Sequence, residues 1–300
     1  MNSAISFLAL AILSARAFGA VPSQAQLTID NTIGGKGAYL SAEGVYKVVL
    51  PREAAAILQD YQRMSPNLGL NSWVAFASAV HQEAVLTGEL LLLEDEVDSV
   101  VTVALRGRLE VTGLSPLRAF DGPRIEVLNL TGTGPFSELA SDFRKCLDEI
   151  QRVRRAGSMR SIRIGLPTPP MESAIDPEPL NAALSVRGTI VDGVYMAAIG
   201  RRALVHGETI GREMGIATWF SFAGKNDHAV VHGEFVESSD GLKKLLTAIR
   251  AKNIKIVSIR NHLAGEHPSL LFVHFRAEGR SVQIAKDLRE VLEVQVGRPH

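Results

Sequence analysis

The amino-acid sequence predicts an α+β protein built from two tandem homologous units. Residues 83–134 and 228–279 align without a gap at a constant offset of 145 positions. In both segments, strand-like apolar runs are followed by apolar residues at the spacing of one helix face. The two tryptophans of the chain, Trp73 and Trp219, stand just before these segments. A self-match of this length indicates a duplicated fold.

The apolar pattern supports the duplication more strongly than the 9 identities among 52 aligned positions. In both copies the apolar residues recur at i, i+3, i+4 and i+7, as one buried helix face requires. The match also continues upstream, because residues 44–46 recur as residues 193–195. The matched helix positions are Val97, Val100, Val101 and Ala104 in the first unit, and Leu242, Leu245, Leu246 and Ile249 in the second.

Each unit is predicted to follow the order β-β-β-α-β-β-α. Its β-α-β-β-α part is typical of a ferredoxin-like split βαβ core, to which extra strands are added. Two strands of the second unit are apolar on both faces, so we expect both sides of its sheet to be covered. In the first unit we expect strands at 45–50, 73–77, 84–92, 109–114 and 124–130, with helices at 95–106 and 137–154. In the second we expect strands at 194–199, 219–223, 229–236, 255–260 and 270–276, with helices at 241–251 and 281–292.

The chain is expected to begin with a secretory signal peptide. Residues 5–13 form a short apolar run, and the small residues after it fit cleavage near residues 19–25. The run is too short to span a membrane, so we expect an exported protein of the periplasm or extracellular space, with no transmembrane segment after cleavage. The expected segments are a signal peptide at 1–25, a first unit at 26–154, a Gly- and Pro-rich linker at 155–173 and a second unit at 174–300.

Composition excludes several classes of function. Lys plus Arg equals Asp plus Glu, at 32 each, so the chain lacks the basic field of a non-specific nucleic-acid binder. Cys146 is the single cysteine, which rules out an intrachain disulfide; its apolar neighbours on the predicted helix indicate burial. The sequence contains no nucleophile elbow, no phosphate-binding loop and no zinc-binding pairs of cysteines.

Histidines are distributed unequally between the two units. Five of the eight lie in the second unit between His228 and His274, whereas the first unit has only His81. In the alignment, His232 faces Thr87 and His274 faces Asn129. Such divergence is expected if one copy carries a site and the other is a scaffold. It is equally expected from drift on a solvated face.

The second unit carries a stretch that resembles the LppY/LpqO-type family, bacterial exported proteins and lipoproteins defined by a domain of unknown function. Residues 260–268 read RNHLAGEHP and lead into an apolar strand, 271–275, that contains a histidine. In that family a His-Asn-His, then a Glu-Glu-Pro, then a strand with a histidine recur in each copy. Here Arg260 replaces the first histidine and His267 the second glutamate, while residues 115–117 of the first unit lack the motif.

If the family's histidines bind a metal, the resemblance leaves the second unit with His262, His274 and Glu266 as ligands for a transition metal such as zinc. Strand geometry argues against a single site. A turn near residue 265 places the two histidines on one face but on the order of 13 Å apart. One ion can then bind both only if a bulge or another element brings them together. The other candidates to bind a ligand or metal are Asn261, His232 and Glu234.

Two functions remain open at this point. The first is a non-catalytic exported binding or scaffold protein, whose partner is a small ligand or an envelope protein, with a homo-oligomer as a further alternative. The second is a metal-dependent hydrolase or other metalloenzyme with its site in the second unit. A third interpretation makes His262 and His274 ordinary hydrogen-bonded sheet residues. No cofactor is certain from the sequence.

Overall fold

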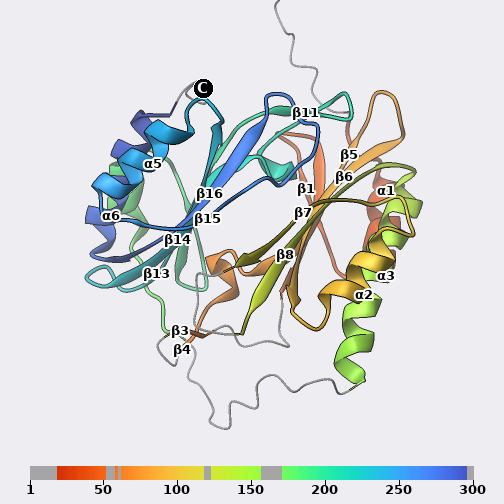
Figure 1. Cartoon of the computed structure of the whole chain (residues 1–300), viewed down its shortest axis with the longest axis horizontal. Helices are drawn as coiled ribbons and strands as arrows, with labels where there is room; N and C mark the ends of the chain where they lie inside the picture. Colours follow the sequence, from red (N-terminus) through yellow and green to blue (C-terminus); the bar gives the residue numbers. More distant parts are fainter. Residues whose placement is uncertain (1–18, 52–57, 60–61, 118–122, 157–170, 296–300) are drawn as a thin grey trace, which may run out of the picture.

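The structure is a computed structural model, and it describes residues 19–51, 58–59, 62–117, 123–156 and 171–295. Each unit forms a six-stranded sheet with helices on one face, and the two sheets face each other in the middle of the molecule (Figure 1). The layers therefore run helices, sheet, sheet, helices. No helix within the described ranges is both long and apolar enough to span a membrane.

The first unit has the sheet order β1-β2-β5-β6-β8-β7, with every neighbouring pair antiparallel. A short hairpin of β3 (Leu58–Gln59) and β4 (Gln62–Arg63) and the 3-10 helix η1 (Pro66–Leu68) lie between β2 and β5. The main elements are α1 (Ser23–Ile33), β1 (Ala38–Leu40), β2 (Val45–Pro51), β5 (Asn71–Ser78), β6 (Ala84–Leu93), α2 (Val97–Ala104), β7 (Glu110–Leu117), β8 (Ile125–Gly134) and α3 (Phe136–Arg155).

The second unit repeats this order as β9-β10-β13-β14-β16-β15, again antiparallel throughout. A hairpin of β11 (Ala203–Val205) and β12 (Glu208–Ile210) and the 3-10 helix η2 (Arg212–Met214) occupy the same place in the chain order. The main elements are α4 (Pro177–Leu184), β9 (Thr189–Val191), β10 (Val194–Gly200), β13 (Ala217–Gly224), β14 (Ala229–Ser238), α5 (Leu242–Ala251), β15 (Lys255–Arg260), β16 (Leu270–Gly279) and α6 (Ser281–Glu293).

The predicted fold class is confirmed. In the first unit β6 and β7 run parallel with β8 between them, which is a split βαβ arrangement, and β14, β16 and β15 repeat it. The offset of 145 also holds in the hydrogen-bond register, because Glu89 pairs with Asn129 as Glu234 pairs with His274. The fourth place of the core is filled by the preceding strand, β5 or β13.

A helix precedes the strands of each unit, and the sequence patterns did not predict it. Helix α1 begins at Ser23, inside the segment expected to be the signal peptide, and buries Ile29 and Ile33 against α3. Helix α4 is its counterpart; the Asp176 side chain caps it by accepting from the amide of Glu178. Both helices are short, with few buried positions, so their periodicity is weak. Of the expected linker, residues 157–170 lie outside the described residues.

An equivalent hydrogen-bond triangle fixes each of these helices to its sheet. Asp30 Oδ1 accepts from the Gly37 amide at 2.9 Å and from the Tyr46 hydroxyl at 2.6 Å. In the second unit, the side-chain oxygen of Asn181 accepts from the Gly188 amide and the Tyr195 hydroxyl, at 2.9 and 3.0 Å. The matching geometry supports the duplication independently of the strand alignment.

Two apolar layers separate helices from sheets, and a third region lies between the sheets. The helix-facing layers bury large aromatic residues, Phe76 and Phe143 in the first unit and Phe235 and Phe275 in the second. Between the sheets, side chains of both units share two smaller apolar clusters. Both faces of each sheet are thus covered, as the apolar strands predict. Cys146 is buried in the first helix-facing layer, in agreement with the prediction.

A reciprocal contact between tryptophan and glycine sets how the two sheets meet. Gly69, at the end of η1, has φ of 79°, and a Cβ atom there would lie 2.3 Å from Cη2 of Trp219. Gly215, at the end of η2, has φ of 95°, and a Cβ atom there would lie 2.8 Å from Cη2 of Trp73. Each tryptophan therefore packs on the turn of the other unit, where only glycine leaves room.

A reciprocal hydrogen bond accompanies this packing. Thr87 Oγ1 donates to the carbonyl oxygen of Met214 at 2.9 Å. At the equivalent place His232 Nδ1 lies 3.0 Å from the carbonyl oxygen of Leu68. The two units are therefore related by an approximate two-fold arrangement, and the space that remains between the sheets belongs to both.

Candidate ligand and metal site between the units

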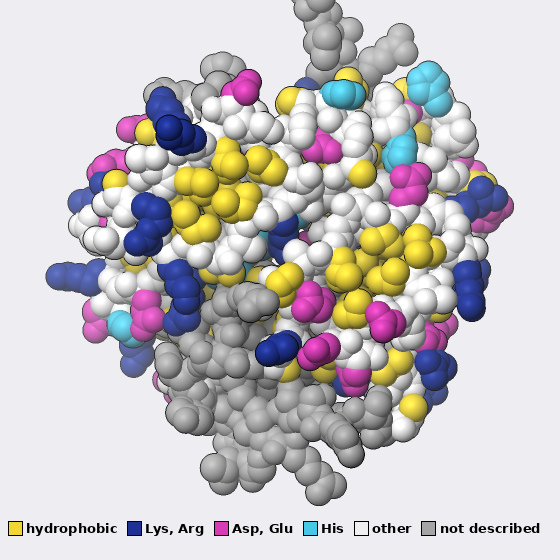
Figure 2. Space-filling model, in the orientation of Figure 1, with side chains coloured by type: hydrophobic (Ala, Val, Ile, Leu, Met, Phe, Trp, Pro, Cys, Tyr) yellow, Lys and Arg dark blue, Asp and Glu magenta, His cyan; other side chains and the backbone are white. Residues whose placement is uncertain are grey.

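A cavity of about 610 Å³ lies between the two sheets. Its volume is in the range of sites for small organic molecules. The space-filling view shows a recess between the two halves, with basic side chains at its base (Figure 2). The apolar wall residues include Trp73, Trp219, Leu91, Leu117, Met196 and Phe220, and the charged ones are Lys47, Glu89, Arg187, Arg212, Glu213, Glu234 and Arg260.

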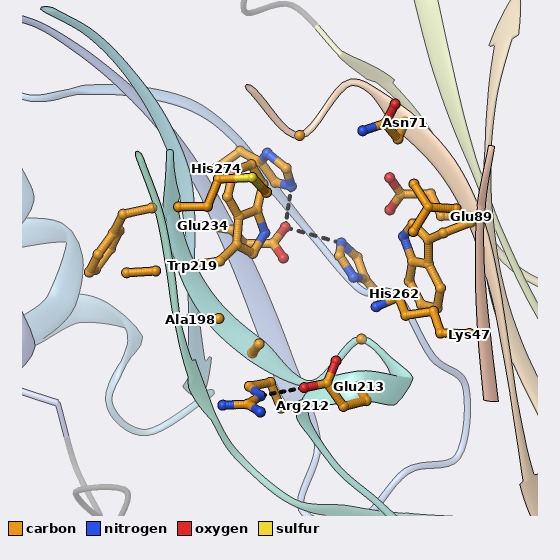
Figure 3. Close-up of a pocket in the computed structure, with 18 of the residues that line it drawn as sticks. Lys47, Asn71, Glu89, Ala198, Arg212, Glu213, Trp219, Glu234, His262 and His274 are labelled. Carbon is orange, nitrogen blue, oxygen red and sulfur yellow. Dashed lines mark hydrogen bonds and ion pairs between the residues drawn. The ribbon is translucent and has the colours of Figure 1, made fainter. Parts of the chain in front are cut away.

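On the second unit's side of this cavity, three potential metal ligands converge from three parts of the sheet. Glu234 of β14 and His274 of β16 are direct cross-strand neighbours, and His262 follows β15 (Figure 3). Glu234 Oε2 contacts His274 Nε2 and lies 3.2 Å from His262 Nε2. One ligand atom from each of the three lies within 4.8 Å of the other two, and all three residues are buried.

The chain brings His262 to this place by leaving the sheet. Strand β15 ends at Arg260, after a register shift between Ile256 and Ser258. The His262 ring then stacks on Phe272, with centroids 3.7 Å apart and planes 9° apart. The carbonyl oxygen of His262 accepts a hydrogen bond from Thr112 Oγ1 of the first unit, at 2.6 Å. The separation expected for a regular hairpin is therefore wrong, because the strand end and β7 together redirect the residue.

Burial and charge determine the ionisation of this cluster. Burial alone would raise the pKa of Glu234, but the neighbouring His262 and His274 hold that pKa well below its ordinary value. Burial lowers the pKa of His274, and the nearby Arg260 guanidinium lowers it further against the opposing effect of Glu234. The Glu234 carboxylate is therefore stabilised in its ionised form, and burial opposes a positive charge on the His274 imidazole.

Arg260, which departs from the family pattern, was not predicted as a site residue, yet its side chain completes the cluster. Its Nη2 contacts His274 Nε2 and lies 3.7 Å from Glu234 Oε2. Its Nη1 donates to Ser115 Oγ of the first unit at 3.1 Å. The residue is only 7% exposed, so the guanidinium compensates the charge of Glu234 in a poorly solvated place.

The remaining predicted site residues do not belong to the three-residue cluster, although the His232 ring lies 5.7 Å from that of His274. Glu266 is buried, but its Oε1 accepts from the Leu270 amide at 3.0 Å and stabilises the turn. Asn261 is exposed. His232 lines the inter-unit contact, and burial lowers its pKa to about 3, with further contributions from His274 and Arg260. The three-residue cluster therefore contains Glu234 in place of Glu266.

The equivalent place in the first unit has a different chemistry. Glu89 corresponds to Glu234, but Asn129 replaces His274 and donates its Nδ2 to Glu89 Oε2 at 3.3 Å. Lys47 lies over the Trp73 ring at 4.4 Å, and burial lowers the pKa of its amine. Across the cavity from the histidine cluster, the wall therefore offers an amine, a carboxylate and an indole (Figure 3).

Two chemical capabilities follow from this arrangement. A carboxylate and two imidazoles can hold a transition metal and leave its remaining positions open towards a ligand. The cavity as a whole combines two indoles with several charged groups, which suits a small molecule that has an apolar body and polar substituents.

Comparison with known proteins places the chain in a family but gives it no activity. No characterised protein matches it significantly. Among solved structures it is similar to the trimeric bacterial microcompartment shell protein PduB, with 10% identity over 86% of this chain and 89% of that chain and a TM-score of 0.21. It is also similar to EtuB from Clostridium kluyveri, with 8% identity, 88% and 96% coverage and a TM-score of 0.20. Scores this low support no conclusion.

A family model described as Domain of Unknown Function (DUF1259) matches residues 27–149 and residues 178–294. These two segments coincide with the two structural units. The chain therefore belongs to the family defined by this domain of unknown function.

Proposed function

We propose that this protein is a binding protein that holds a small molecule in the cavity between its two units. The observation that carries the proposal is the cavity itself, about 610 Å³ in volume and walled by both sheets. Its tryptophans and buried charged groups are the kinds of residue that line small-molecule sites. The cavity is lined by residues of both units, so both copies of the fold are needed to form it.

Export and kinship with LppY/LpqO-type proteins are part of the same proposal. They rest on the apolar run at residues 5–13 and on the motif at residues 260–268. An envelope location would match a protein that captures a small molecule outside the cytoplasm. Fractionation of the native cells, with detection of the mature N-terminus by mass spectrometry, checks this part separately.

Native mass spectrometry of the protein purified from its own cells tests the binding proposal. We expect a bound mass that dissociates on activation and rebinds to the stripped protein. Ala198 lines the cavity, so Ala198→Trp should fill it and abolish rebinding. Ala182→Trp is the matched control, because Ala182 is exposed on α4. No bound mass, or rebinding that Ala198→Trp leaves unchanged, would contradict the proposal.

The second candidate is a metalloenzyme that uses a divalent ion of the zinc class, and the convergence of Glu234, His262 and His274 favours it. A metal there would act as a Lewis acid and lower the pKa of a bound water. We expect one equivalent of zinc per chain, removed by His262→Ala and by His274→Ala. Glu89→Gln in the first unit is the matched control and should retain the metal. Elemental analysis and hydrolysis of p-nitrophenyl esters by the metal-loaded protein check the two parts.

A further inference from the structure

We propose that the Arg260 guanidinium and a divalent metal ion are alternative occupants of the Glu234–His262–His274 cluster. In this chain the arginine thereby opposes metal binding and sets the affinity for metals of the zinc class. The inference deepens the second candidate function and rests on the same cluster. It rests on the contacts of Arg260 with His274 and Glu234, on its permanent positive charge, and on the different residues at the equivalent place in the first unit.

The guanidinium and a metal ion would compete for the same ligand atoms. Nη2 of Arg260 contacts Nε2 of His274 and lies 3.7 Å from Oε2 of Glu234. These two atoms are also the ones that converge with His262 in the potential metal site. An imidazole nitrogen offers one lone pair, so His274 Nε2 can accept from the guanidinium or bind a metal, but not both.

The positive charge of Arg260 also opposes the binding of a metal ion. The described part of the cluster holds one carboxylate, and Arg260 already compensates it. Arginine does not lose its proton in proteins, so a divalent ion would face a permanent positive charge at short range. If the guanidinium moved away, it would also lose the hydrogen bond that its Nη1 donates to Ser115 Oγ of the first unit, at 3.1 Å.

His262 completes the potential metal site beside the arginine. Its Nε2 lies 3.2 Å from Oε2 of Glu234, within ion-pair distance but outside hydrogen-bond geometry. A carboxylate oxygen and an imidazole nitrogen this close in a buried site can both turn a lone pair towards a cation when the nitrogen carries no proton. The cluster therefore keeps metal-binding geometry while the arginine supplies the positive charge.

The first unit provides an internal reference. Ser115, which accepts from Arg260, is the residue aligned with Arg260 at the offset of 145. The first unit also has Asn129 and Leu117 in place of His274 and His262. At these aligned positions the first unit therefore has neither an arginine nor an imidazole, and the metal-binding cluster found among the described residues lies in the second unit.

Zinc titration of the full mature chain, stripped with chelator and followed with a competing zinc indicator, tests the inference. We expect Arg260→Gln to tighten zinc binding by about tenfold or more, because a unit charge next to a divalent ion repels it even at high effective dielectric. Arg260→His should tighten it further by adding a ligand. Glu293→Gln, a change of an exposed residue on α6 outside the cavity, should leave the zinc affinity equal to that of the wild-type chain.

Removal of Arg260 leaves Glu234 without its countercharge, so thermal unfolding with and without zinc accompanies the titration. We expect Arg260→Gln to melt below the wild type in chelator and to recover with zinc. The double variant Glu234→Gln/Arg260→Gln should fold without zinc and bind none. Equal zinc affinity of wild type and Arg260→Gln, whether tight or absent, would overturn the inference. If both bind zinc equally tightly, the metalloenzyme candidate remains. If only the Arg260 variants bind zinc, the inference is supported and the metalloenzyme candidate is removed.

Discussion

The two units share one backbone plan but differ in what they present to the space between them. Both carry the same strand order, the same triangle of helix, glycine and tyrosine, and the same tryptophan packed on a partner turn. The second unit places Glu234, Arg260 and two histidines at the cavity, whereas the first places Glu89, Asn129 and Lys47 there. The contacts that fix the helices and join the two sheets are therefore the same in both units, whereas the residues that line the cavity differ.

The largest difference we expect concerns the paired carboxylates. Glu234→Ala should lower the free energy of unfolding by about 3–5 kcal/mol, because it leaves Arg260 buried without its partner. Glu89→Ala should cost about 1 kcal/mol or less, since Glu89 is only partly buried and the hydrogen bond that it accepts from Asn129 is long. Urea denaturation of both variants measures the contrast. Equal losses would show that the two walls are energetically alike.

The reciprocal glycines should give the next largest effect. Gly69→Ala and Gly215→Ala should each cost about 2–3 kcal/mol, from a positive φ and from contact with the tryptophan of the other unit. Gly69→Ala should be the worse, since its Cβ atom approaches Trp219 to 2.3 Å against 2.8 Å for Gly215 and Trp73. Gly265→Ala is the control.

Gly265 has φ of 73° but no atom within 4 Å of a Cβ position, so only the backbone cost applies there. We expect about 1 kcal/mol for this control. Denaturation curves for the three variants separate strain from packing. If the control loses as much as the other two, the tryptophan contacts do not contribute to the joint between the sheets.

The inter-unit hydrogen bond should have a smaller effect. Thr87→Val removes the donor to the carbonyl oxygen of Met214 and leaves that oxygen buried, which should cost about 1–2 kcal/mol. The side chain keeps its shape, so packing changes little. Denaturation in urea gives the value, and an unchanged midpoint would show that the bond is dispensable at the joint.

The smallest effect we expect is at the helix-fixing triangle. Asp30→Asn should cost about 1 kcal/mol or less, because Asn181 makes the same two bonds in the second unit. Burial, together with the hydrogen bond to Asp30 and its charge, raises the pKa of Tyr46 to about 12, whereas burial accounts for the rise in the pKa of Tyr195. The variant should therefore lower the pKa of Tyr46 and leave that of Tyr195 unchanged in an ultraviolet titration. A change in the pKa values of both tyrosines would show that the effect of Asp30 is not confined to the triangle of the first unit.

The sequence was sufficient for the fold of each unit but not for the joint between them. Period and offset predicted the β6-α2-β7-β8 run and its copy, because these elements are long and amphipathic. The short helix α1 was not predicted, since its two deeply buried residues, Ile29 and Ile33, give little periodicity. The contact of Trp219 with Gly69 depends on how two sheets stack, and no local pattern carries that information.

The candidate site was predicted in part for the same reason. The sequence pattern named His262 and His274 as candidates, but regular hairpin geometry separated them, and the family resemblance supplied Glu266 as the carboxylate. In the structure Glu234 lies opposite His274 as Glu89 lies opposite Asn129, but the offset between the units relates these two pairs without showing that their members are cross-strand neighbours. What the pattern could not provide was the departure of the chain after Arg260 and its contact with Thr112 of the other unit.

The joining of two copies in one chain has a consequence for how such a cavity can evolve. In a symmetric dimer of identical chains, every substitution appears twice and must suit both sides of the interface. Here a change at Ser115 leaves Arg260 as it is, and the two residues have become partners although they occupy the same position of the repeat. Fusion thus frees one half to specialise while its sibling preserves the shape that both depend on.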